Sequence, residues 1–335
     1  MVRVVVDAMG SDHAPLTEVE GAVRALAELP PTFVVQLVGP ADQLEAALAS
    51  HPDVDRNRLL VVDAPEVIGM GEKPLEAVRK KRKSSIVVGL GVQAAGQSDA
   101  FVSAGNTGAV LAASTIVLGL HPGVERATVG TLLPSVDGPV LMLDAGANLD
   151  CSARELLGFA SLGSIYMRDV LNRRSPTVGL LNVGEEEGKG TAIVKEAHEL
   201  LKHASGFTYL GNIEGRDILA GHSKRGRVDV VVCDGFVGNV VLKFYESVLG
   251  LIRHLADGEG LWELPAAQRA FRSLDYSQYG GAPLLGVKGL SVICHGSSNS
   301  NAIMNAIRVA VHAVERGLNQ HIGLEFAGHE ALGQA

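Results

Sequence analysis

The stretch that decides the fold is residues 2–10, which read Val2-Arg3-Val4-Val5-Val6-Asp7-Ala8-Met9-Gly10. A run rich in β-branched residues that ends at once in Asp and Gly is typical of a buried strand leading into a tight turn. A helical spacing follows at residues 16–29. The same order of strand, polar turn and helix recurs along the chain.

Working outward from this unit, the sequence predicts a strand at residues 33–38, a helix at 43–49 and a strand at 59–62. Further strands are predicted at residues 100–103, 129–133, 140–143, 177–182, 207–210, 228–233 and 290–294. Helical stretches lie between most of them. This alternation predicts an α/β fold with a mostly parallel sheet covered by helices on both faces.

The composition agrees with such a core. Among 335 residues, 47% are hydrophobic, only 4% are aromatic, and 40 are glycine. Closely packed parallel strands and helices suit side chains of this kind, whereas a surface for single-stranded nucleic acid would need exposed rings. The net charge of −8 also argues against nucleic acid as a partner, so any anion site needs a local group of donors.

Other classes of function find little support in the sequence. Cys151, Cys233 and Cys294 are far apart and lack metal-ligand spacing, so we interpret them as buried free thiols. No paired histidine ligands or H-E-x-x-H sequence points to a metal, and no G-x-G-x-x-G points to a dinucleotide cofactor. No run approaches the ~20 apolar residues of a membrane span, and the chain begins directly on a strand. We therefore expect a cytoplasmic protein without metal or cofactor.

Six predicted strands end in turns rich in Asn, Asp and Gly. Because ligands bind beyond the carboxyl ends of the strands in open α/β sheets, these turns together predict one shared site. Any single turn is better explained by chain reversal alone, and only the six together favour a site. The turns are residues 7–10, 103–108, 144–148, 182–184, 211–215 and 234–239.

Residues 184–191 read GEEEGKGT, follow a strand and open a helix. Glycines let backbone N–H groups approach an anion at a helix start, and Lys189 adds a positive charge. The spacing does not match a Walker loop. The alternative is that the three glutamates only complement the helix dipole.

Two more turns offer polar donors. In residues 103–108 the donors are Ser103, Asn106 and Thr107, and we expect Thr107 to cap the next helix. His295-Gly296-Ser297-Ser298 places an imidazole and hydroxyls beside a helix start, without the G-x-S-x-G of a serine hydrolase. A third feature, Arg79-Lys80-Lys81-Arg82-Lys83, is either a solvated helix end or a docking patch for an acidic partner.

Taken together, these turns resemble the phosphate acyltransferase family of bacterial phospholipid synthesis, from Val4 to about Ile307. The stretches that carry the resemblance are residues 7–10, 103–108, 144–148, 178–190, 211–217, 229–243, 279–287 and 295–298. Two departures stand out. Ser11 occupies a position where relatives often carry a second Gly, and the segment 249–276 has fewer lysines than expected.

The resemblance implies a doubly wound three-layer α/β/α core, similar to phosphotransacetylase and isocitrate dehydrogenase, in a homodimer. It implies that acyl carrier protein donates a long-chain acyl group to inorganic phosphate without a cofactor. The acyl phosphate then passes to a membrane glycerol-3-phosphate acyltransferase, and the enzyme touches the membrane weakly through helices at the tip of the dimer.

On this basis we expect direct attack of phosphate on the thioester, with the protein holding the reactants and stabilising the oxyanion. The expected catalytic residues are Lys189, Asn212, His295 and Asp234. The expected binding residues are Asp7, Gly10, Ser103, Asn106, Thr107, Asn148, Gly188, Glu214, Asn239 and Ser297. Asp234 and Glu214 are expected to orient donors rather than act as bases, because a carboxylate repels phosphate.

The organisation expected from the sequence is one large domain, residues 1–335, with a protruding helical hairpin at about 249–278. Apolar residues from Val241 to Leu255 follow a helical spacing. This hairpin is either an interfacial membrane anchor or part of a dimer interface. Three rival functions remain open: a short-chain phosphotransacetylase that uses coenzyme A, a non-catalytic membrane scaffold and a hydride-transfer dehydrogenase.

Overall fold

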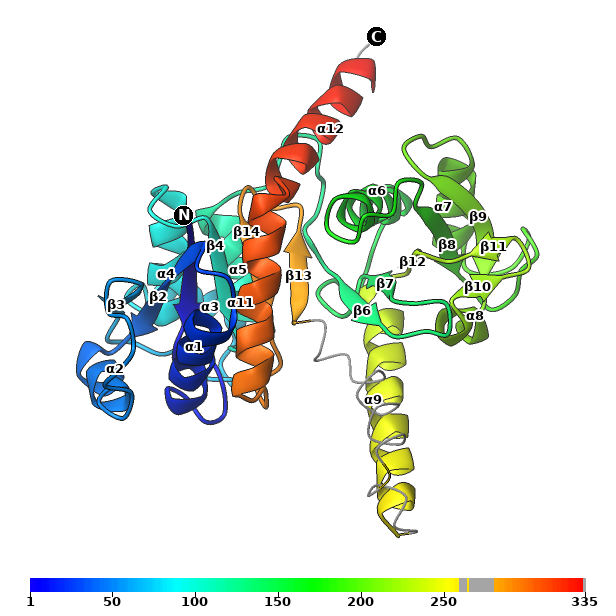
Figure 1. The fold of residues 1–335 in the computed structure, drawn as a ribbon. Helices are drawn as coiled ribbons and strands as arrows, with labels where there is room; N and C mark the ends of the chain where they lie inside the picture. Colours follow the sequence, from blue (N-terminus) through cyan, green and yellow to red (C-terminus); the bar gives the residue numbers. More distant parts are fainter. Residues whose placement is uncertain (259–263, 265–279, 334–335) are drawn as a thin grey trace. The chain divides into compact units, whose positions relative to one another are not determined.

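A computed structural model describes residues 1–258, 264 and 280–333, and these residues form two compact units (Figure 1). The first unit comprises Met1–Ala127 and Tyr279–Ala335, and the second comprises Thr128–Gln278. The chain therefore leaves the first unit once and returns to it. Each unit has its own sheet.

The first unit follows the predicted alternation of strands and helices. Its elements are β1 (Val2–Asp7), α1 (Leu16–Glu28), β2 (Phe33–Gly39), α2 (Ala41–Leu48), β3 (Leu59–Asp63), α3 (Pro74–Lys80), α4 (Ser85–Ala94), β4 (Ala100–Ser103), α5 (Thr107–Val117), β13 (Ala282–Leu285), β14 (Leu290–Ile293), α11 (Ser300–Glu315) and α12 (Leu318–Gly333). Its strands lie in the order β3-β2-β1-β4-β14-β13. The first five of these are parallel, and β13 is antiparallel to β14.

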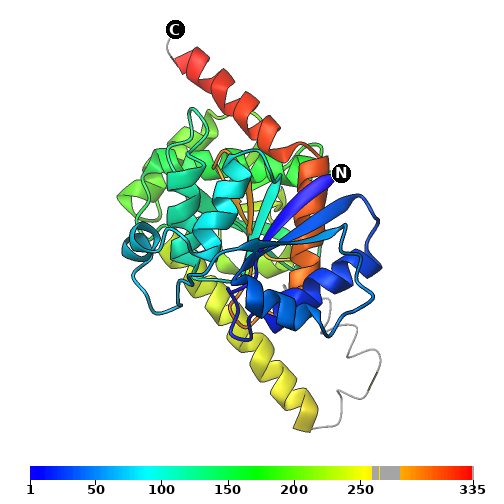
Figure 2. The same ribbon diagram turned by 90° about the vertical axis from the view of Figure 1, so that its left-hand side faces the viewer.

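Helices cover both faces of this sheet, as Figures 1 and 2 show. On one face α1 packs on α11, where Gly21 lies against Ile303. On the other face α4 packs on the central strands, and its Gly89 meets Val5 and Phe101. Because side chains alternate along a strand, both faces of β1 are buried.

The second unit contains the remaining elements. They are β5 (Thr128–Val129), β6 (Thr131–Leu133), β7 (Val140–Leu143), α6 (Ala153–Asp169), β8 (Thr177–Leu181), α7 (Ala192–Lys202), β9 (Thr208–Ile213), α8 (Gly215–Ala220), β10 (His222–Ser223), β11 (Gly226–Arg227), β12 (Val230–Val232) and α9 (Gly235–Gly258). The main sheet has the order β6-β7-β12-β8-β9. All of its pairs are parallel except β6 with β7.

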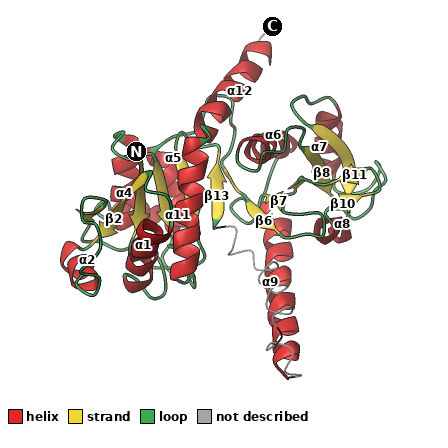
Figure 3. Ribbon diagram, in the orientation of Figure 1, coloured by secondary structure: helices red, strands yellow, loops and turns green. Residues whose placement is uncertain are grey.

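This second sheet is also covered on both faces, as the colours of Figure 3 show. Gly163 of α6 packs against Leu143 and Val230 on one face. On the other face Met142 and Val231 belong to a core cluster with Tyr245 of α9. Helices on both faces of mixed sheets confirm the predicted fold class.

The sequence placed the end of β9 too early. Asn212 was interpreted as part of a turn, whereas it lies on β9 itself. The ladder shifts register beside Gly211, which has a φ of 87°. A bulge at a glycine resembles a turn in sequence, although the strand continues beyond it.

α9 corrects the prediction that no run is long enough to span a membrane. Within the described part of the chain, it is the one helix that is long and apolar enough to do so, over Gly235–Ala256. Its Val241, Leu242, Tyr245 and Leu249 pack on the core of the second unit, so part of this apolar character serves the core. Of the predicted hairpin at 249–278, residues 259–263 and 265–278 lie outside the described residues. The single-domain prediction stays a prediction.

Candidate functional site

In the first unit, the predicted residues Asp7 and Ser103 join two turns. Asp7 ends β1, is buried, and accepts the Ser103 hydroxyl at 2.7 Å and the Met9 N–H at 3.2 Å. The Ser103 oxygen in turn accepts the Gly105 N–H at 3.0 Å. Burial raises the pKa of Asp7, against hydrogen bonds that lower it. Both side chains are thus engaged in shaping the turns.

Gly10 is required by close packing of the same two turns. A Cβ atom at this position would lie 2.5 Å from the Gly105 nitrogen and 2.9 Å from the Ala104 carbonyl carbon. Real Cβ atoms do not approach backbone so closely, so a side chain here would push the turns apart. Gly10 therefore shapes the site by its lack of a side chain.

Asn106 caps α5, which corrects the expectation that Thr107 is the cap. Its Oδ1 accepts the Ala109 N–H at 3.0 Å, and Thr107 is the first helical residue, with an exposed side chain. The Asn106 Nδ2 donates to the carbonyls of Met70 at 2.9 Å and Glu72 at 3.2 Å. Cap and amide together hold the segment before α3 against the start of α5.

His295 and Ser297 lie together after β14, as the sequence predicted for neighbouring donors. His295 Nδ1 lies 2.7 Å from the Ser297 hydroxyl and accepts the Ser297 N–H at 3.2 Å. An Nδ1 that accepts an N–H places the proton of a neutral ring on Nε2. Both side chains are exposed, so the Nε2–H is an available donor beside the start of α11.

In the second unit, Asp144 organises the turn that holds Asn148. Asp144 is fully buried and accepts the N–H groups of Gly146, Ala147 and Asn148, at 2.7 to 3.2 Å. It also accepts the Asn148 side-chain amide at 2.7 Å. Burial raises the pKa of Asp144, and these hydrogen bonds oppose the rise. The sequence drew attention to Asn148 and missed Asp144 as the centre of the turn.

The start of α9 packs onto this turn. Gly235 N donates to the Asn148 carbonyl at 2.7 Å, and a Cβ at Gly238 would clash with the Asp144 carbonyl oxygen. Asp234 accepts the Val237 N–H at 2.8 Å and thereby caps the helix. Asn239, one position beyond Gly238, is exposed next to Gly146. The glycines of the sequence G-F-V-G-N thus allow the helix start to approach the strand end.

The loop at 182–191 has the predicted position between a strand and a helix. Thr191 caps α7 by accepting the Val194 N–H at 3.3 Å. Lys189 is exposed, and none of the described residues forms an ion pair with it. Gly190 has a φ of 91°, whereas Gly188 faces open space, so only Gly190 needs to be glycine for its conformation.

The acidic run in this loop is tied to other elements. Glu185 pairs with Lys224 at 3.1 Å and with Arg216 at 3.2 Å, and Glu187 pairs with Lys202 at 3.0 Å. Lys224 lowers the pKa of Glu185, and Lys202 lowers that of Glu187. Neighbouring cations therefore compensate Glu185 and Glu187, and within the described residues the Lys189 charge is not engaged in an ion pair.

Asn212 and Glu214 support the same region from β9 and α8. Asn212 is 3% exposed, and its Nδ2 donates to the Glu186 carbonyl at 3.0 Å. Its Oδ1 is buried without a hydrogen-bond partner among the described residues. Glu214 precedes α8, shares a reciprocal capping arrangement with Asp217, and pairs with Arg216 at 3.1 Å. Asn212 fastens the loop that carries Lys189.

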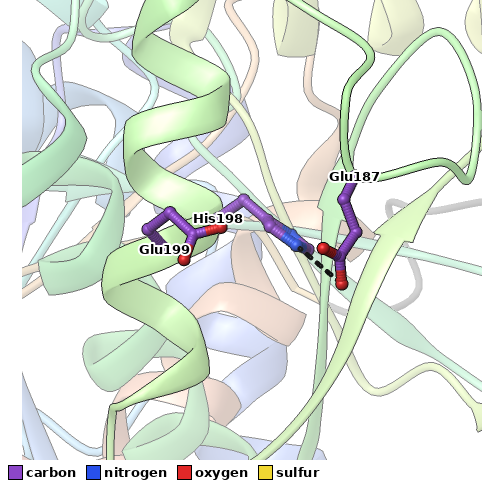
Figure 4. A group of neighbouring side chains, drawn as sticks. All are labelled: Glu187, His198 and Glu199. Atoms are coloured by element: carbon purple, nitrogen blue, oxygen red, sulfur yellow. Dashed lines mark ion pairs between the residues drawn. The ribbon is translucent and has the colours of Figure 1, made fainter.

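Figure 4 shows a neighbouring group with the donor types of a metal site: Glu187, His198 and Glu199. The buried His198 ring lies 2.7 Å from the Tyr209 hydroxyl through Nδ1 and 3.7 Å from Glu187 through Nε2. Lys202 Nζ, however, lies 3.0 Å from Glu187 and 3.1 Å from Glu199. The lysine supplies the positive charge that these carboxylates require, so we interpret the group as an anchor of the loop to α7.

Two other expectations concern isolated features. All three cysteines are buried free thiols, and burial raises the pKa of both Cys151 and Cys294 to about 12. In the basic run Lys81 donates to the Val67 carbonyl and pairs with Glu72, each within 2.7 Å. The other four cations of the run are exposed. The cysteine interpretation is confirmed, and the basic surface consists of four residues rather than five.

Comparison with known proteins identifies similar chains over nearly the whole length. A family model described as fatty acid synthesis protein matches residues 2–321. The phosphate acyltransferase of Heliobacterium modesticaldum is 45% identical over 96% of this chain and 98% of its own. That of Acidobacterium capsulatum is 46% identical over 98% of both chains.

Among solved structures, a phosphotransacetylase from Streptococcus pyogenes has a TM-score of 0.63 with 17% identity, and 94% of each chain is covered. At this identity the likeness concerns the fold alone. It agrees with the doubly wound architecture described above.

Proposed function

The chain belongs to the fatty acid synthesis protein family, whose curated relatives are named phosphate acyltransferases, and from this premise we propose that its acyl donor is a long-chain acyl carrier protein. The protein is an enzyme that transfers an acyl group to phosphate in fatty acid and phospholipid synthesis. The observation that carries this conclusion is the identity of about 45% over nearly the full chain with enzymes of that name.

The proposed reaction is a direct acyl transfer. A phosphate oxygen attacks the thioester carbonyl carbon, a C–O bond forms, and the C–S bond breaks. The thiolate that leaves takes up a proton, and the product is an acyl phosphate. Phosphate is itself a nucleophile, so the protein's part is to hold the reactants and stabilise the developing oxyanion.

In the second unit, we assign phosphate binding to the loop at 184–191. Lys189 supplies an exposed charge, and the start of α7 supplies backbone N–H groups. Glu185 and Glu187 are each ion-paired with a cation outside the loop, which lessens their repulsion of the phosphate. Gly188 keeps the approach to Lys189 open.

In the first unit, we assign a donor role to His295. Its ring presents Nε2–H while Nδ1 is held by Ser297. A neutral imidazole in this orientation donates to an oxyanion or protonates a leaving thiolate. In the turns at 103–108 and 295–298, the exposed hydroxyl-bearing side chains are Thr107 and Ser297.

The other site residues position these groups. Asp7, Ser103 and Asn106 engage their polar atoms in hydrogen bonds within the first unit. Asn148, Asn212 and Asp234 do the same in the second unit. We therefore propose that they set the shape of the turns, while Glu214 orients Arg216 and Asn239 faces the ligand.

The partner assignments rest on surface charge and apolar exposure. An acidic carrier protein needs a basic patch, and Arg79, Lys80, Arg82 and Lys83 form an exposed one around the end of α3. α9 exposes the apolar side chains of Phe244, Leu251 and Leu255, which suit a second copy of the chain or a membrane surface. We propose a cytoplasmic homodimer in weak peripheral contact with the membrane, where a glycerol-3-phosphate acyltransferase takes the product.

A comparison of donors tests the proposal. Purified enzyme with phosphate should release thiol much faster from palmitoyl-acyl carrier protein than from acetyl-coenzyme A at equal concentration. A preference for acetyl-coenzyme A would instead make the protein a short-chain phosphotransacetylase. Absence of phosphate-dependent thiol release from both donors would favour a scaffold, and a nicotinamide-dependent absorbance change would indicate a dehydrogenase.

A further inference from the structure

A buried carboxyl group lies beneath the turn that follows β1. Glu18 stands in the first turn of α1 and is 0% exposed. Its Oε1 accepts the backbone N–H of Ser11 at 2.8 Å. Its second oxygen and the Ser11 hydroxyl are both buried without hydrogen-bond partners among the described residues. Such a position is costly for an uncompensated carboxylate and much less so for a neutral carboxylic acid.

The turn held by Glu18 touches two other turns of the first unit. Gly10 packs on the backbone of Ala104 and Gly105, and the Asp12 N–H donates to the Gly296 carbonyl at 2.8 Å. Gly296 stands between His295 and Ser297. The Ser11 backbone, fixed by Glu18, is thus the central link between the turn at 103–108 and the turn that carries the imidazole.

We propose that Glu18, in its protonated form, is a positioning residue that fixes the Gly10–Asp12 turn and through it the backbone that carries His295. The inference rests on the proposed function, because it concerns the alignment of His295 for acyl transfer to phosphate. Glu18 itself touches no substrate.

The surroundings of Glu18 explain why its protonation matters. The titratable groups that face it are Asp7, at the end of β1, and the Cys294 thiol, after β14. Burial raises the pKa of Glu18 to about 7, and Asp7 adds to the rise, while the N–H and the hydroxyl of Ser11 oppose it. Above that pH an ionised Glu18 is repelled by Asp7 in a buried space, where the Ser11 N–H and hydroxyl compensate its charge only in part, so the turn loosens.

Two substitutions separate the effect of the hydrogen-bond acceptor at position 18 from the effect of its charge. Glu18→Gln keeps an oxygen for the Ser11 N–H, stays neutral at every pH and places an N–H beside the Ser11 hydroxyl. Glu18→Met fills the same space without an acceptor. We expect Glu18→Met to lower kcat/KM for palmitoyl-acyl carrier protein by ~10-fold or more, on the scale of a buried donor left unpaired, and Glu18→Gln to retain wild-type activity near pH 6.

The pH dependence of activity distinguishes this role from a purely structural one, because a purely structural role of Glu18 would not change it. Phosphate itself titrates in this range, so the quantity to measure is the kcat/KM of Glu18→Gln divided by that of the wild type. The ratio should be near 1 at pH 6 and rise several-fold, to about 3 or more, by pH 8.5, since only wild-type Glu18 ionises. Glu20→Gln, an exposed neighbour on α1, should give a flat ratio.

Amide hydrogen exchange provides a test that does not depend on activity. Peptides covering residues 8–16 should exchange faster in Glu18→Met than in the wild type, and Val19→Ala, a packing control on α1, should not reproduce a change confined to these peptides. A ratio that stays flat with pH, or unaltered exchange together with full activity in Glu18→Met, would overturn the inference. Loss of acyl transfer in the wild type itself would instead overturn the proposed function and leave the exchange result standing.

Discussion

At the scale of single residues, the clearest prediction concerns Lys189. It is an exposed cation in a loop where Glu185 and Glu187 are already ion-paired. Removing a preorganised charge from a transition-state site costs on the order of 100-fold in turnover. We therefore expect Lys189→Ala to lower kcat by ~100-fold at saturating phosphate and carrier protein.

The matched control for this change is Lys195→Ala, an exposed lysine of α7 in the same unit. It alters net charge equally and lies outside the loop. Steady-state kinetics of both variants decide the assignment. A Lys189→Ala enzyme with near wild-type kcat would remove Lys189 from the phosphate site.

Glu18 also predicts how stability depends on pH. Its folded pKa is about 7, above the ~4.3 of an unfolded glutamate, so the folded chain holds this proton more tightly. The stability from this group is full below the unfolded value and is lost as the pH rises through about 7. Glu18→Gln does not titrate and escapes the loss.

Relative to wild type, the free energy of unfolding of Glu18→Gln should therefore increase between pH 5 and pH 8, by on the order of 3 kcal/mol. Urea denaturation of both proteins at the two pH values measures the difference. Asp7 is present in both proteins, so its contribution differs between them only through its interaction with Glu18. An equal difference at pH 5 and pH 8 would mean that Glu18 does not change its ionisation on folding.

At the scale of elements, the hydrophobic pattern predicted most strands of both sheets with small errors at their ends, but it missed β13 and predicted β5 and β6 as one strand. The apolar run Val2–Val6 predicted a strand, and the structure has β1 at these residues. The error at Asn212 arose because a bulge at Gly211 has the same residue types as a turn. Local composition does not distinguish a bulge from a turn, because the difference depends on whether the neighbouring strand continues to pair with the chain beyond the glycine.

Much of the candidate site was also visible in the sequence, because polar turns at strand ends are conspicuous. What the sequence could not show is which polar atoms are already engaged. Asn106 and Asn212 have the right chemistry for a ligand, yet their amide nitrogens donate to carbonyls at 2.9 to 3.0 Å. The sequence did not single out Asp144 and Glu18, because their importance comes from their burial and from the backbone N–H groups that the fold directs at them.

The end of α3 gives a prediction about the carrier protein. Lys81 is fastened to Glu72, whereas Lys80 and Arg82 are exposed. Reversing the two exposed cations, Lys80→Glu and Arg82→Glu, should raise the KM for palmitoyl-acyl carrier protein several-fold, ~5-fold or more, with little change in kcat. The effect should weaken as salt is added.

Steady-state kinetics at low and physiological ionic strength measure this effect. Lys195 and Lys243 offer a control pair of exposed lysines on the second unit, outside the basic run. If their reversal raises KM equally, general charge rather than this patch attracts the carrier. An unchanged KM in the Lys80/Arg82 variant would make the run a solvated helix end.

At the scale of the whole molecule, α9 poses the question of what covers its apolar side chains. Phe244 is 70% exposed and Leu251 is 57% exposed. Phe244→Glu with Leu251→Glu should reduce flotation with anionic liposomes, dimer formation, or both, because a charge on this surface is costly in either setting. Ser247→Glu places a charge on the same helix and serves as the control.

Liposome flotation and analytical ultracentrifugation of the same samples distinguish the settings. Loss of flotation with an intact dimer makes the helix a membrane contact, and loss of the dimer makes it an interface. If the wild type never floats with anionic vesicles, the membrane proposal is wrong. If the double variant remains dimeric and floats as well as wild type, α9 has neither role.

The central claim is that the acyl group leaves acyl carrier protein and arrives on phosphate. The most direct measurement follows the product: palmitoyl-acyl carrier protein and ¹⁸O-labelled phosphate are incubated with the enzyme, and the products are analysed by mass spectrometry. We predict palmitoyl phosphate that carries the label, in amounts equal to the carrier thiol released. Free palmitate with no labelled acyl phosphate, or thiol release that does not depend on phosphate, would contradict it.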